Sequence, residues 1–316
     1  MRTIAITQFG GREQLKQMEL PQPEPGPGEV LIRVKAAGVN PVDWKIREGW
    51  LKDLVPHQFP LVPGWDVAGT VEEIGQDVDS FQPGDNVYAY ARKPIVQAGC
   101  YAEYVVLEAR HAARKPTSCS FPEAASIPLA ALTAYQALFD TAKLCRGEQI
   151  LIHAAAGGVG GFAVQLAHHA GATVWATASA PNHAYVKTLG AREIIDYRSA
   201  DVAQVVKGKH PAGMDVVFDC VGGKALTTSP DVLTSGGRLV SIVDPIACGQ
   251  LADNGVNAQF VFVEPNAPQL DDLRMRVEQG SLKTELAAVL PLAEAARAHE
   301  MIESQHTRGK IVLTLD

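Results

Sequence analysis

The chain has 316 residues, which is enough for two domains with separate hydrophobic cores. Apolar residues make up 47% and charged residues 20%, which is typical of a globular protein. The formal net charge of −7 excludes a general basic field for nucleic acid or an acidic membrane surface, and no apolar run is long enough to span a bilayer. We therefore expect neither nucleic-acid nor membrane partners.

The first part of the chain, to about Phe121, is expected to form strands and turns. The stretch 29–40, EVLIRVKAAGVN, alternates apolar and polar residues, as a half-buried strand does. The preceding PQPEPGPGE is a proline-rich loop. Short strands are also expected at 66–75, 85–91 and 100–107, with glycine and proline between them. This pattern predicts an all-β domain, built as a small barrel.

From about Pro122 the hydrophobic period changes. A helix is expected at 127–142, and then strands alternate with helical segments. The strands are expected at 149–154, 173–178, 193–196, 215–220 and 237–243, and the helical segments at 160–171, 182–190 and 225–236. The strands are apolar on both faces, which favours a doubly wound parallel sheet covered by helices. Beyond about Gln259 we expect helices at 269–280 and 292–304 and a last strand at 310–315.

A glycine cluster lies between the first strand of this sheet and the helix that follows. The segment QILIHAAAGGVGGFAVQLA places Gly157, Gly158 and Gly160 in the turn. Free backbone N–H groups at a helix start suit a pyrophosphate, and the strand–turn–helix context is what a dinucleotide-binding motif requires. The turn predicts a dinucleotide site, although Ala155 replaces the first glycine of the usual fingerprint.

The end of the second strand bears on which dinucleotide is bound. NAD-selective sites carry an acid there, about 20 residues on, that binds the ribose 2′-hydroxyl, whereas this chain has Ala178. An acid would repel the 2′-phosphate of NADP, so we expect NADPH. Ser179, His183 and Tyr197 are candidates for the phosphate region, and Arg198 is a candidate for its positive charge. The alternative is that Ser179 and His183 cap a helix and that Tyr197 packs.

The five cysteines are scattered, without a CxxC pair, so neither a disulfide framework nor a zinc ribbon is supported. The first residues lack the apolar core of a signal peptide. We expect a reducing, cytoplasmic compartment.

Several motifs together resemble one family. They are AAAGGVG at 154–160, GVNPVDWKIREG at 38–49, PLVPGWDVAGTVEEIG at 60–75, SIPLAALTAYQAL at 126–138 and HTRGKIVL at 306–313. The chain resembles a zinc-independent medium-chain dehydrogenase/reductase, close to the NADPH:quinone oxidoreductase and alkenal reductase group. The resemblance implies a GroES-like β-barrel catalytic domain at 1–122 and 260–316. It also implies an inserted Rossmann domain at 123–259 and an active site in the cleft.

The resemblance to zinc-dependent alcohol dehydrogenases breaks down at the metal. Those enzymes use a Cys after the first long strand and a His within Gly-His-Glu. Here Asn40 stands at the first position, and the second reads Gly64-Trp65-Asp66. We can assemble no set of three or four converging ligands, and the adjacent pair His168-His169 is expected on a solvated helix face. No metal site is predicted.

Without a metal, an acceptor that needs little activation is favoured. Oxidation of a plain alcohol gains most from a Lewis acid, whereas hydride addition to a quinone gives a resonance-stabilised phenolate. Addition to an α,β-unsaturated carbonyl gives an enolate that one or two hydrogen-bond donors stabilise. We therefore expect an NADPH-dependent reductase of quinones or reactive enones. Alternatives are a reductase of a dedicated enoyl metabolite and a non-catalytic NADPH-binding structural or sensor protein.

Candidate residues of the active site come from the family match. Asn40 is expected to contact nicotinamide or substrate, or else to stabilise the turn before Pro41. Asp43 is expected to hold that loop through backbone N–H groups, and Lys45 either donates to an enolate oxygen or is surface. Aromatic side chains that either wall a flat pocket or belong to the core are Trp44, Trp50, Tyr88 and Tyr90.

The same match implies the remaining cofactor contacts. Thr133 is expected on the nicotinamide side, and Lys310 either reaches the cofactor or forms a surface salt bridge. Contacts are also implied in the glycine turn and at later strand ends: Ala156, Gly157, Gly158, Val159, Cys220, Val221, Ser241, Ile242, Val243, Phe262 and Val263. An exposed sheet edge near 237–243, together with the resemblance, predicts a homodimer.

Overall fold

The computed structural model describes residues 1–315 and divides the chain into two compact units. The strand-rich unit comprises Met1–Leu132 and the segment from Glu264 onward, and the parallel-sheet unit comprises Thr133–Val263. We expected divisions at 122/123 and 259/260, so the observed ones lie 10 and 4 residues later. Helix α2 (Phe121–Ala125) accounts for part of the first difference, because it packs against strands β3 (Glu29–Val39) and β5 (Asp66–Ile74).

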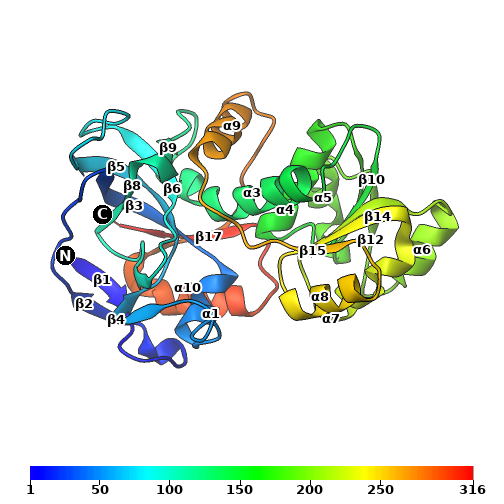
Figure 1. Ribbon diagram of the computed structural model, residues 1–316, viewed down its shortest axis with the longest axis horizontal. Coiled ribbons are helices and arrows are strands. Elements are labelled where there is room, and N and C mark those ends of the chain that lie inside the picture. Colours follow the sequence, from blue (N-terminus) through cyan, green and yellow to red (C-terminus); the bar gives the residue numbers. More distant parts are fainter. Residues whose placement is uncertain (316) are drawn as a thin grey trace. The chain divides into compact units, whose positions relative to one another are not determined.

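The strand-rich unit is built on a seven-stranded sheet (Figure 1). Its order is β16-β17-β3-β5-β6-β9, and β8 also pairs with β3. The bounds of the other strands are β6 (Asn86–Tyr90), β8 (Tyr104–Glu108), β9 (Ala112–Arg114), β16 (Leu286–Pro291) and β17 (Lys310–Thr314). Two small sheets join β1 (Arg2–Ala5) to β2 (Lys16–Glu19) and β4 (His57–Val62) to β7 (Val96–Ala98). This is the GroES-like domain that the resemblance implied.

Strand β3 is the centre of this unit, because it pairs antiparallel with β5, β8 and β17. Residues near the two ends of the chain are therefore neighbours, with Ile311 opposite Val39. Gly38 permits a close approach here: a Cβ atom at this residue would lie 2.4 Å from the carbonyl oxygen of Ala125 and 2.8 Å from the Asp66 side chain. This approach brings β5 and α2 up to the end of β3.

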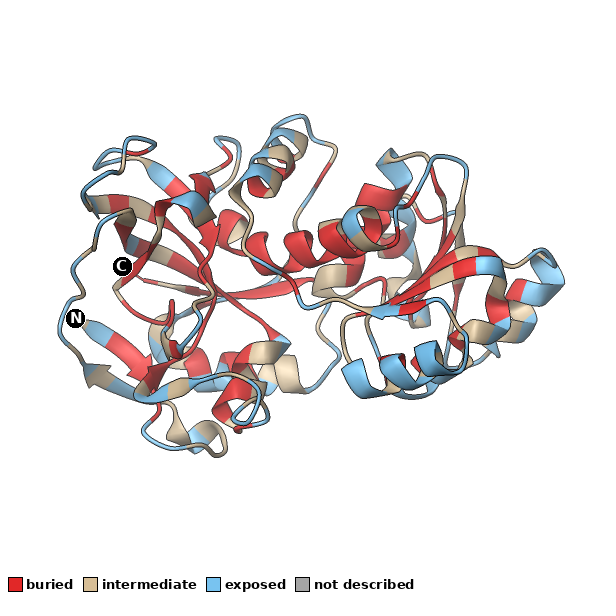
Figure 2. Ribbon diagram, in the orientation of Figure 1, coloured by how far each residue is buried: buried red, intermediate tan, exposed pale blue. Residues whose placement is uncertain are grey.

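The helices of the strand-rich unit are α1 (Pro41–Arg47), α2, α9 (Ala267–Glu278) and α10 (Ala295–Glu303). Helix α10 contacts α1 and β17, so the C-terminal segment completes the core of this unit. Figure 2 shows that much of this unit's interior is buried. Its apolar core includes Val34, Val67, Tyr101, Ala298 and Ile311.

The parallel-sheet unit contains six strands in the order β12-β11-β10-β13-β14-β15, and every pairing is parallel. Their bounds are β10 (Gln149–Ile152), β11 (Thr173–Thr177), β12 (Glu193–Ile195), β13 (Met214–Asp219), β14 (Leu233–Ser241) and β15 (Ala258–Phe260). The strand order is that of a Rossmann sheet, and it reverses direction between β10 and β13. The predicted doubly wound sheet is confirmed.

Helices cover both faces of this sheet (Figure 1). Helix α4 (Gly158–His169) packs on β10 and β11, and α5 (His183–Thr188) contacts β12. Helices α6 (Val202–Lys209), α7 (Gly223–Thr228) and α8 (Pro245–Asp253) contribute Val206, Leu226 and Cys248 to one apolar cluster with the sheet. Helix α3 (Pro128–Tyr135) precedes β10 and continues into a π-helical turn, Gln136–Thr141.

Some local expectations were wrong. The helix expected over 225–236 ends at Thr228 and gives way to a 3₁₀ turn containing Pro230, and Leu233 already begins β14. The stretch 237–243 is not a sheet edge, because β14 lies between β13 and β15. Elements that the sequence did not suggest are α1, α2, α6, α8, β1, β2, β4, β7, β9, β15 and β16. Across residues 1–315, no helix is both long and apolar enough to cross a membrane.

Candidate cofactor site and active site

The residues proposed to hold the cofactor follow the strands of the parallel sheet at their carboxyl ends. The glycine turn follows β10, Ser179 and His183 follow β11, and Tyr197 follows β12. Cys220 and Val221 follow β13, and the later candidates Ile242, Val243, Phe262 and Val263 follow β14 and β15. Ligands of open α/β sheets bind at this edge, where the strand order reverses, and β10 and β13 flank that point here.

The glycine turn has the geometry that a phosphate requires. Gly157 is the N-cap of α4, with extended backbone, and Gly158 and Val159 begin the helix and are partly exposed. A Cβ atom at Gly160 would lie 2.2 Å from the carbonyl oxygen of Ala154, so only glycine lets the helix approach the turn this closely. Ala156 is buried, and it joins the turn to the helix start.

A buried histidine supports the turn from below. The hydroxyl of Ser229 donates to the carbonyl of Ala225, 2.6 Å away, so it accepts from Nε2–H of His153 at 3.2 Å. Nδ1 of His153 is then left to accept from the Thr177 hydroxyl at 3.3 Å. Thr177 in turn accepts from the backbone N–H of Ala154. Burial lowers the pKa of His153, which favours the neutral ring that this arrangement needs.

The region expected near the ribose phosphate carries no acid at the strand end. Ala178 directly follows β11 and is buried, and the partly exposed Ser179 accepts from the side-chain amide of Asn182. Nε2–H of His183 donates to the carbonyl of Ala178 at 3.1 Å. Tyr197 is exposed, and the guanidinium carbon of Arg198 lies 5.8 Å from the centre of its ring.

The candidate residues that follow the later strands differ in their exposure. Val221 and Phe262 are exposed, whereas Val263 is buried. Ser241 is also buried, and its hydroxyl donates to Asp219 at 2.8 Å. The same carboxylate accepts from the backbone N–H groups of Val221 and Gly222. The side chain of Ser241 therefore orders the β13 loop in this structure. Thr133, the first residue of this unit, is buried.

In the strand-rich unit, a buried polar cluster surrounds Asn40. The side-chain N–H of Asn40 donates to Oδ2 of Asp66 at 2.9 Å, and the ammonium of Lys310 donates to the amide oxygen of Asn40. Lys310 also donates to the carbonyl of Val39 at 3.3 Å and lies 3.5 Å from Oδ2 of Asp66. Oδ1 of Asp66 accepts from the backbone N–H of Leu129.

This placement answers one question that the sequence left open for Lys310. Lys310 is buried, and its three donor sites have three acceptors inside the protein, so it is not the surface salt bridge considered above. To reach a cofactor it would have to give up one of these bonds. Burial lowers the pKa of Lys310 and raises that of Asp66, and their mutual attraction opposes both shifts.

Asp43 lies beside this cluster, and it has the structural role that we expected. Its Oδ2 accepts from the backbone N–H of Asn40 at 2.7 Å and from the hydroxyl of Tyr101 at 3.2 Å. Its Oδ1 is buried without a hydrogen-bond partner. Burial, reinforced by the nearby Asp66, raises the pKa of Asp43 to about 7, although the bond from Asn40 opposes the shift. Asp43 therefore titrates near neutral pH.

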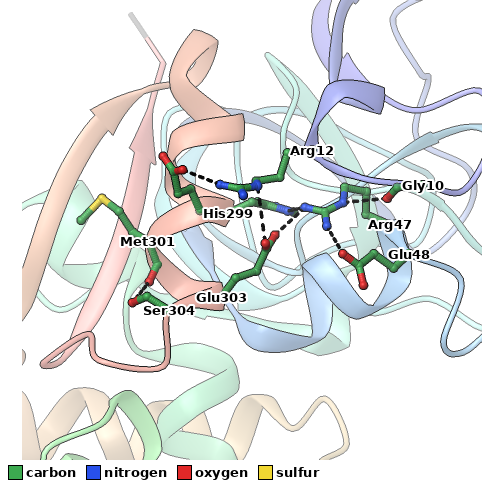
Figure 3. A network of polar contacts seen from close by, with 9 residues as sticks. Gly10, Arg12, Arg47, Glu48, His299, Met301, Glu303 and Ser304 are labelled. Atoms are coloured by element: carbon green, nitrogen blue, oxygen red, sulfur yellow. Dashed lines mark hydrogen bonds and ion pairs between the residues drawn. The ribbon is translucent and has the colours of Figure 1, made fainter.

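A chain of polar contacts continues from Tyr101 to the surface. Figure 3 shows its outer part, in which the fully buried Arg47 contacts His299, Glu48, Glu303 and the carbonyl of Gly10. Because arginine only donates, Nδ1 of His299 accepts from Arg47, and Nε2–H faces the Tyr101 hydroxyl at 3.3 Å. Burial and Arg47 lower the pKa of His299 to about 3, so its ring stays neutral.

The remaining candidates differ in accessibility. The ammonium of Lys45 lies 5.9 Å from the ring centres of both Trp44 and Trp50, and burial lowers its pKa. Tyr88 is wholly buried, and its hydroxyl donates to the carbonyl of Leu270 at 2.5 Å. Tyr90 is also wholly buried. Both tyrosines are core residues in this structure, and this placement argues against a catalytic role for Tyr88.

Among residues 1–315 no group of three or more His, Cys, Asp or Glu side chains is arranged to hold a metal ion. A surface hollow of about 840 Å³ in the strand-rich unit is lined by residues such as Gly26, Phe81 and Arg110, and by none of the candidate site residues.

The cluster of Asn40, Asp66 and Lys310 was not predicted from the sequence, because Asn40 and Asp66 are 26 residues apart and Asp66 and Lys310 are 244 residues apart.

The chain is similar to known proteins over its whole length. Residues 26–117 match the alcohol dehydrogenase GroES-like domain, and residues 189–313 match the zinc-binding dehydrogenase family. A chloroplast envelope quinone oxidoreductase homolog of Arabidopsis thaliana is 35% identical, over 96% of this chain and 95% of that protein.

Solved structures agree with these matches. The quinone oxidoreductase of Coxiella burnetii superposes with a TM-score of 0.91 at 36% identity, covering 100% of this chain and 99% of that one. A mycobacterial protein solved in complex with NADPH gives a TM-score of 0.88 at 30% identity, with both chains fully covered.

The glycine turn yields a matched pair of variants. Gly160→Ala is expected to destabilise the fold by about 2 kcal/mol or more, because its Cβ has no room. A Cβ at Gly157 would be 3.3 Å from Ala154 oxygen, so Gly157→Ala should fold with only a small shift. It should weaken NADPH binding roughly tenfold by blocking close approach of the phosphate. Thermal unfolding and fluorescence titration measure both effects, and wild-type affinity in Gly157→Ala would exclude the turn as the phosphate site.

The raised pKa of Asp43 predicts a pH-dependent stability. The folded protein keeps this proton up to about pH 7, whereas the unfolded chain releases it near pH 4, so stability falls as pH rises between these values. Asp43→Asn keeps an oxygen for Asn40 and Tyr101 but cannot ionise. The free energy of unfolding of this variant relative to wild type should therefore increase by a few kcal/mol between pH 5 and pH 7.5. The difference in melting temperature between the two proteins reports this change. Parallel melting curves for the two proteins would refute the assignment.

Proposed function

The chain belongs to the medium-chain dehydrogenase/reductase superfamily, among relatives named quinone oxidoreductases, and from this membership we propose its reaction. It is an NADPH-dependent oxidoreductase that transfers hydride to a quinone or an α,β-unsaturated carbonyl, without zinc. The observation that carries this proposal is the glycine turn after β10, beside the point where the strand order of the Rossmann sheet reverses.

The cofactor is proposed to be NADPH rather than NADH. Ala178 stands where an acid would repel the 2′-phosphate, and polar or cationic side chains follow the neighbouring strands β11 and β12. These side chains are Ser179, His183, Tyr197 and Arg198. The N-terminus of α4, with Gly157 and Gly158, would hold the pyrophosphate through backbone N–H groups.

The reaction asks little acid–base chemistry of the protein. When bound, NADPH supplies the hydride. Asn40 is proposed to donate a hydrogen bond to the acceptor oxygen, which gains negative charge as the hydride adds, and water then supplies the proton. Lys45, whose ammonium lies beside the packed rings of Trp44 and Trp50, is a second candidate donor, since burial lowers its pKa.

Turnover measurements test this function directly. We expect oxidation of NADPH with 1,4-benzoquinone, 9,10-phenanthrenequinone or an alkenal, faster than oxidation of NADH and unchanged by a metal chelator. Loss of activity with the chelator would instead indicate a metal-dependent dehydrogenase. Tight NADPH binding without turnover on any acceptor would favour a structural or sensor protein. Turnover confined to enoyl thioesters or furanones would favour a dedicated enoyl metabolite.

A pair of variants tests the cofactor preference. Ala178→Asp should lower kcat/KM with NADPH about tenfold or more relative to Ala178→Asn, which has nearly the same shape but no charge. The two variants should differ much less with NADH. Equal effects with both cofactors would mean that Ala178 does not face the 2′-phosphate.

We also propose a homodimer that forms through the parallel sheet. Its edge strands are β15 and β12, and an open edge invites pairing with a second subunit. Light scattering on a size-exclusion column should give twice the mass of one chain, and a species of single-chain mass at micromolar concentration would refute the dimer.

A cytoplasmic location remains a proposal. All five cysteines are free thiols in the structure, which suits a reducing compartment. The similar protein of Arabidopsis thaliana is named for the chloroplast envelope, so cell fractionation is the deciding measurement.

A further inference from the structure

The amide of Asn40 has a fixed orientation. Its oxygen faces the ammonium of Lys310, which only donates, and its nitrogen faces Oδ2 of Asp66, which as a carboxylate only accepts. Exchange of oxygen and nitrogen would break both bonds. Asn40 is also 1% exposed, and its backbone N–H is bound to Asp43. The side chain is therefore held from two sides and at its backbone.

One polar group of this amide remains available. The side-chain nitrogen carries two N–H bonds, and Asp66 accepts one of them. Within residues 1–315 the second has no hydrogen-bond partner, so it is the one donor of Asn40 that a ligand can use. A charge-assisted bond to the amide oxygen polarises the amide and makes this N–H a stronger donor.

Filling the interior does not by itself require a charged pair such as Lys310 and Asp66. Lys310 is 4% exposed, lies on the last strand, and its three donor sites point at Val39, Asn40 and Asp66. A pair of apolar residues would fill this space without the cost of removing two charges from water. A surface ion pair on the same sheet, Arg33 with Glu72, carries no such cost and offers a natural comparison.

We propose that Lys310 and Asp66 are positioning residues for catalysis. They hold the amide of Asn40 with its remaining N–H aimed at the carbonyl oxygen of the hydride acceptor, a quinone or an enone. The ammonium strengthens that donor as negative charge develops on the oxygen, and neither residue touches the acceptor. This inference rests on the proposed function, in which Asn40 contacts the acceptor.

The test removes both charges together, so that no buried charge is stranded. Lys310→Met with Asp66→Asn should keep the fold and the NADPH affinity within twofold, because the donor sites of Lys310 and both carboxylate oxygens of Asp66 are engaged inside the protein. Its kcat should fall tenfold or more, because the amide of Asn40 loses the donor-only ammonium and the acceptor-only carboxylate that together fix its orientation. The matched control, Arg33→Met with Glu72→Gln, removes an exposed pair and should leave kcat unchanged. Where the Met variant melts too low to assay, the double variant Lys310→Gln with Asp66→Asn is used in its place, because Gln keeps a hydrogen-bond donor at position 310.

A double-mutant cycle separates positioning from a purely structural role. Asn40→Ala should lower kcat on its own, and adding the Lys310 and Asp66 changes to it should cost less than a further twofold. Lys310→Arg, which keeps a cation, should retain more activity than Lys310→Met.

The outcomes are distinct. Wild-type protein without turnover on any acceptor would overturn the proposed function, and this inference with it. Wild-type turnover with a charge-free variant of unchanged kcat would overturn the inference alone. An equally large effect of the charge-free changes in the Asn40→Ala background would also overturn it, because Lys310 would then not act through Asn40.

Discussion

A buried ammonium holds together the centre of the strand-rich unit. Lys310 comes from the last strand, Asn40 from the end of β3, and Asp66 from the start of β5. These segments meet because β3 pairs with both β5 and β17 and because Gly38 lets Asp66 come close. A charge without partners in this interior would cost several kcal/mol, so the three polar residues and the local strand arrangement depend on one another.

That dependence links stability to chemistry. The amide of Asn40 is oriented by the same bonds that satisfy Lys310 and Asp66. The proposed donor therefore cannot rotate without breaking hydrogen bonds to these two buried charged groups. Asp43 extends the arrangement through Tyr101 and His299 toward Arg47, and its raised pKa makes the interior sensitive to pH near neutrality. The parallel-sheet unit uses a different device, since backbone N–H groups and glycines form its candidate phosphate site.

Local patterns accounted for the strands and helices with a strong hydrophobic period. The Rossmann alternation, the long strand at 29–40 and the terminal strand at 310–315 are all present. Helix α1 was missed although the sequence carries signals for it, namely Pro41 in the first turn, Asp43 three residues after Asn40, and Gly49 just beyond the end. In the structure Asp43 accepts from the backbone N–H of Asn40, and Gly49 has a positive φ. At seven residues it is too short to show a helical period. The expected sheet edge at 237–243 was wrong, because the three-residue β15 is too short to be recognised from its pattern.

The sequence by itself determined the fold class, the glycine turn and the absence of an acid at Ala178, because each depends on residues close together along the chain. Only the tertiary structure decided which polar residues meet. Lys310 pairs with Asp66 across 244 positions, and Tyr88 turns inward to bond Leu270 across 182. No periodicity or spacing encodes such contacts, since they follow from strand pairing and from the requirement that buried donors and acceptors find partners.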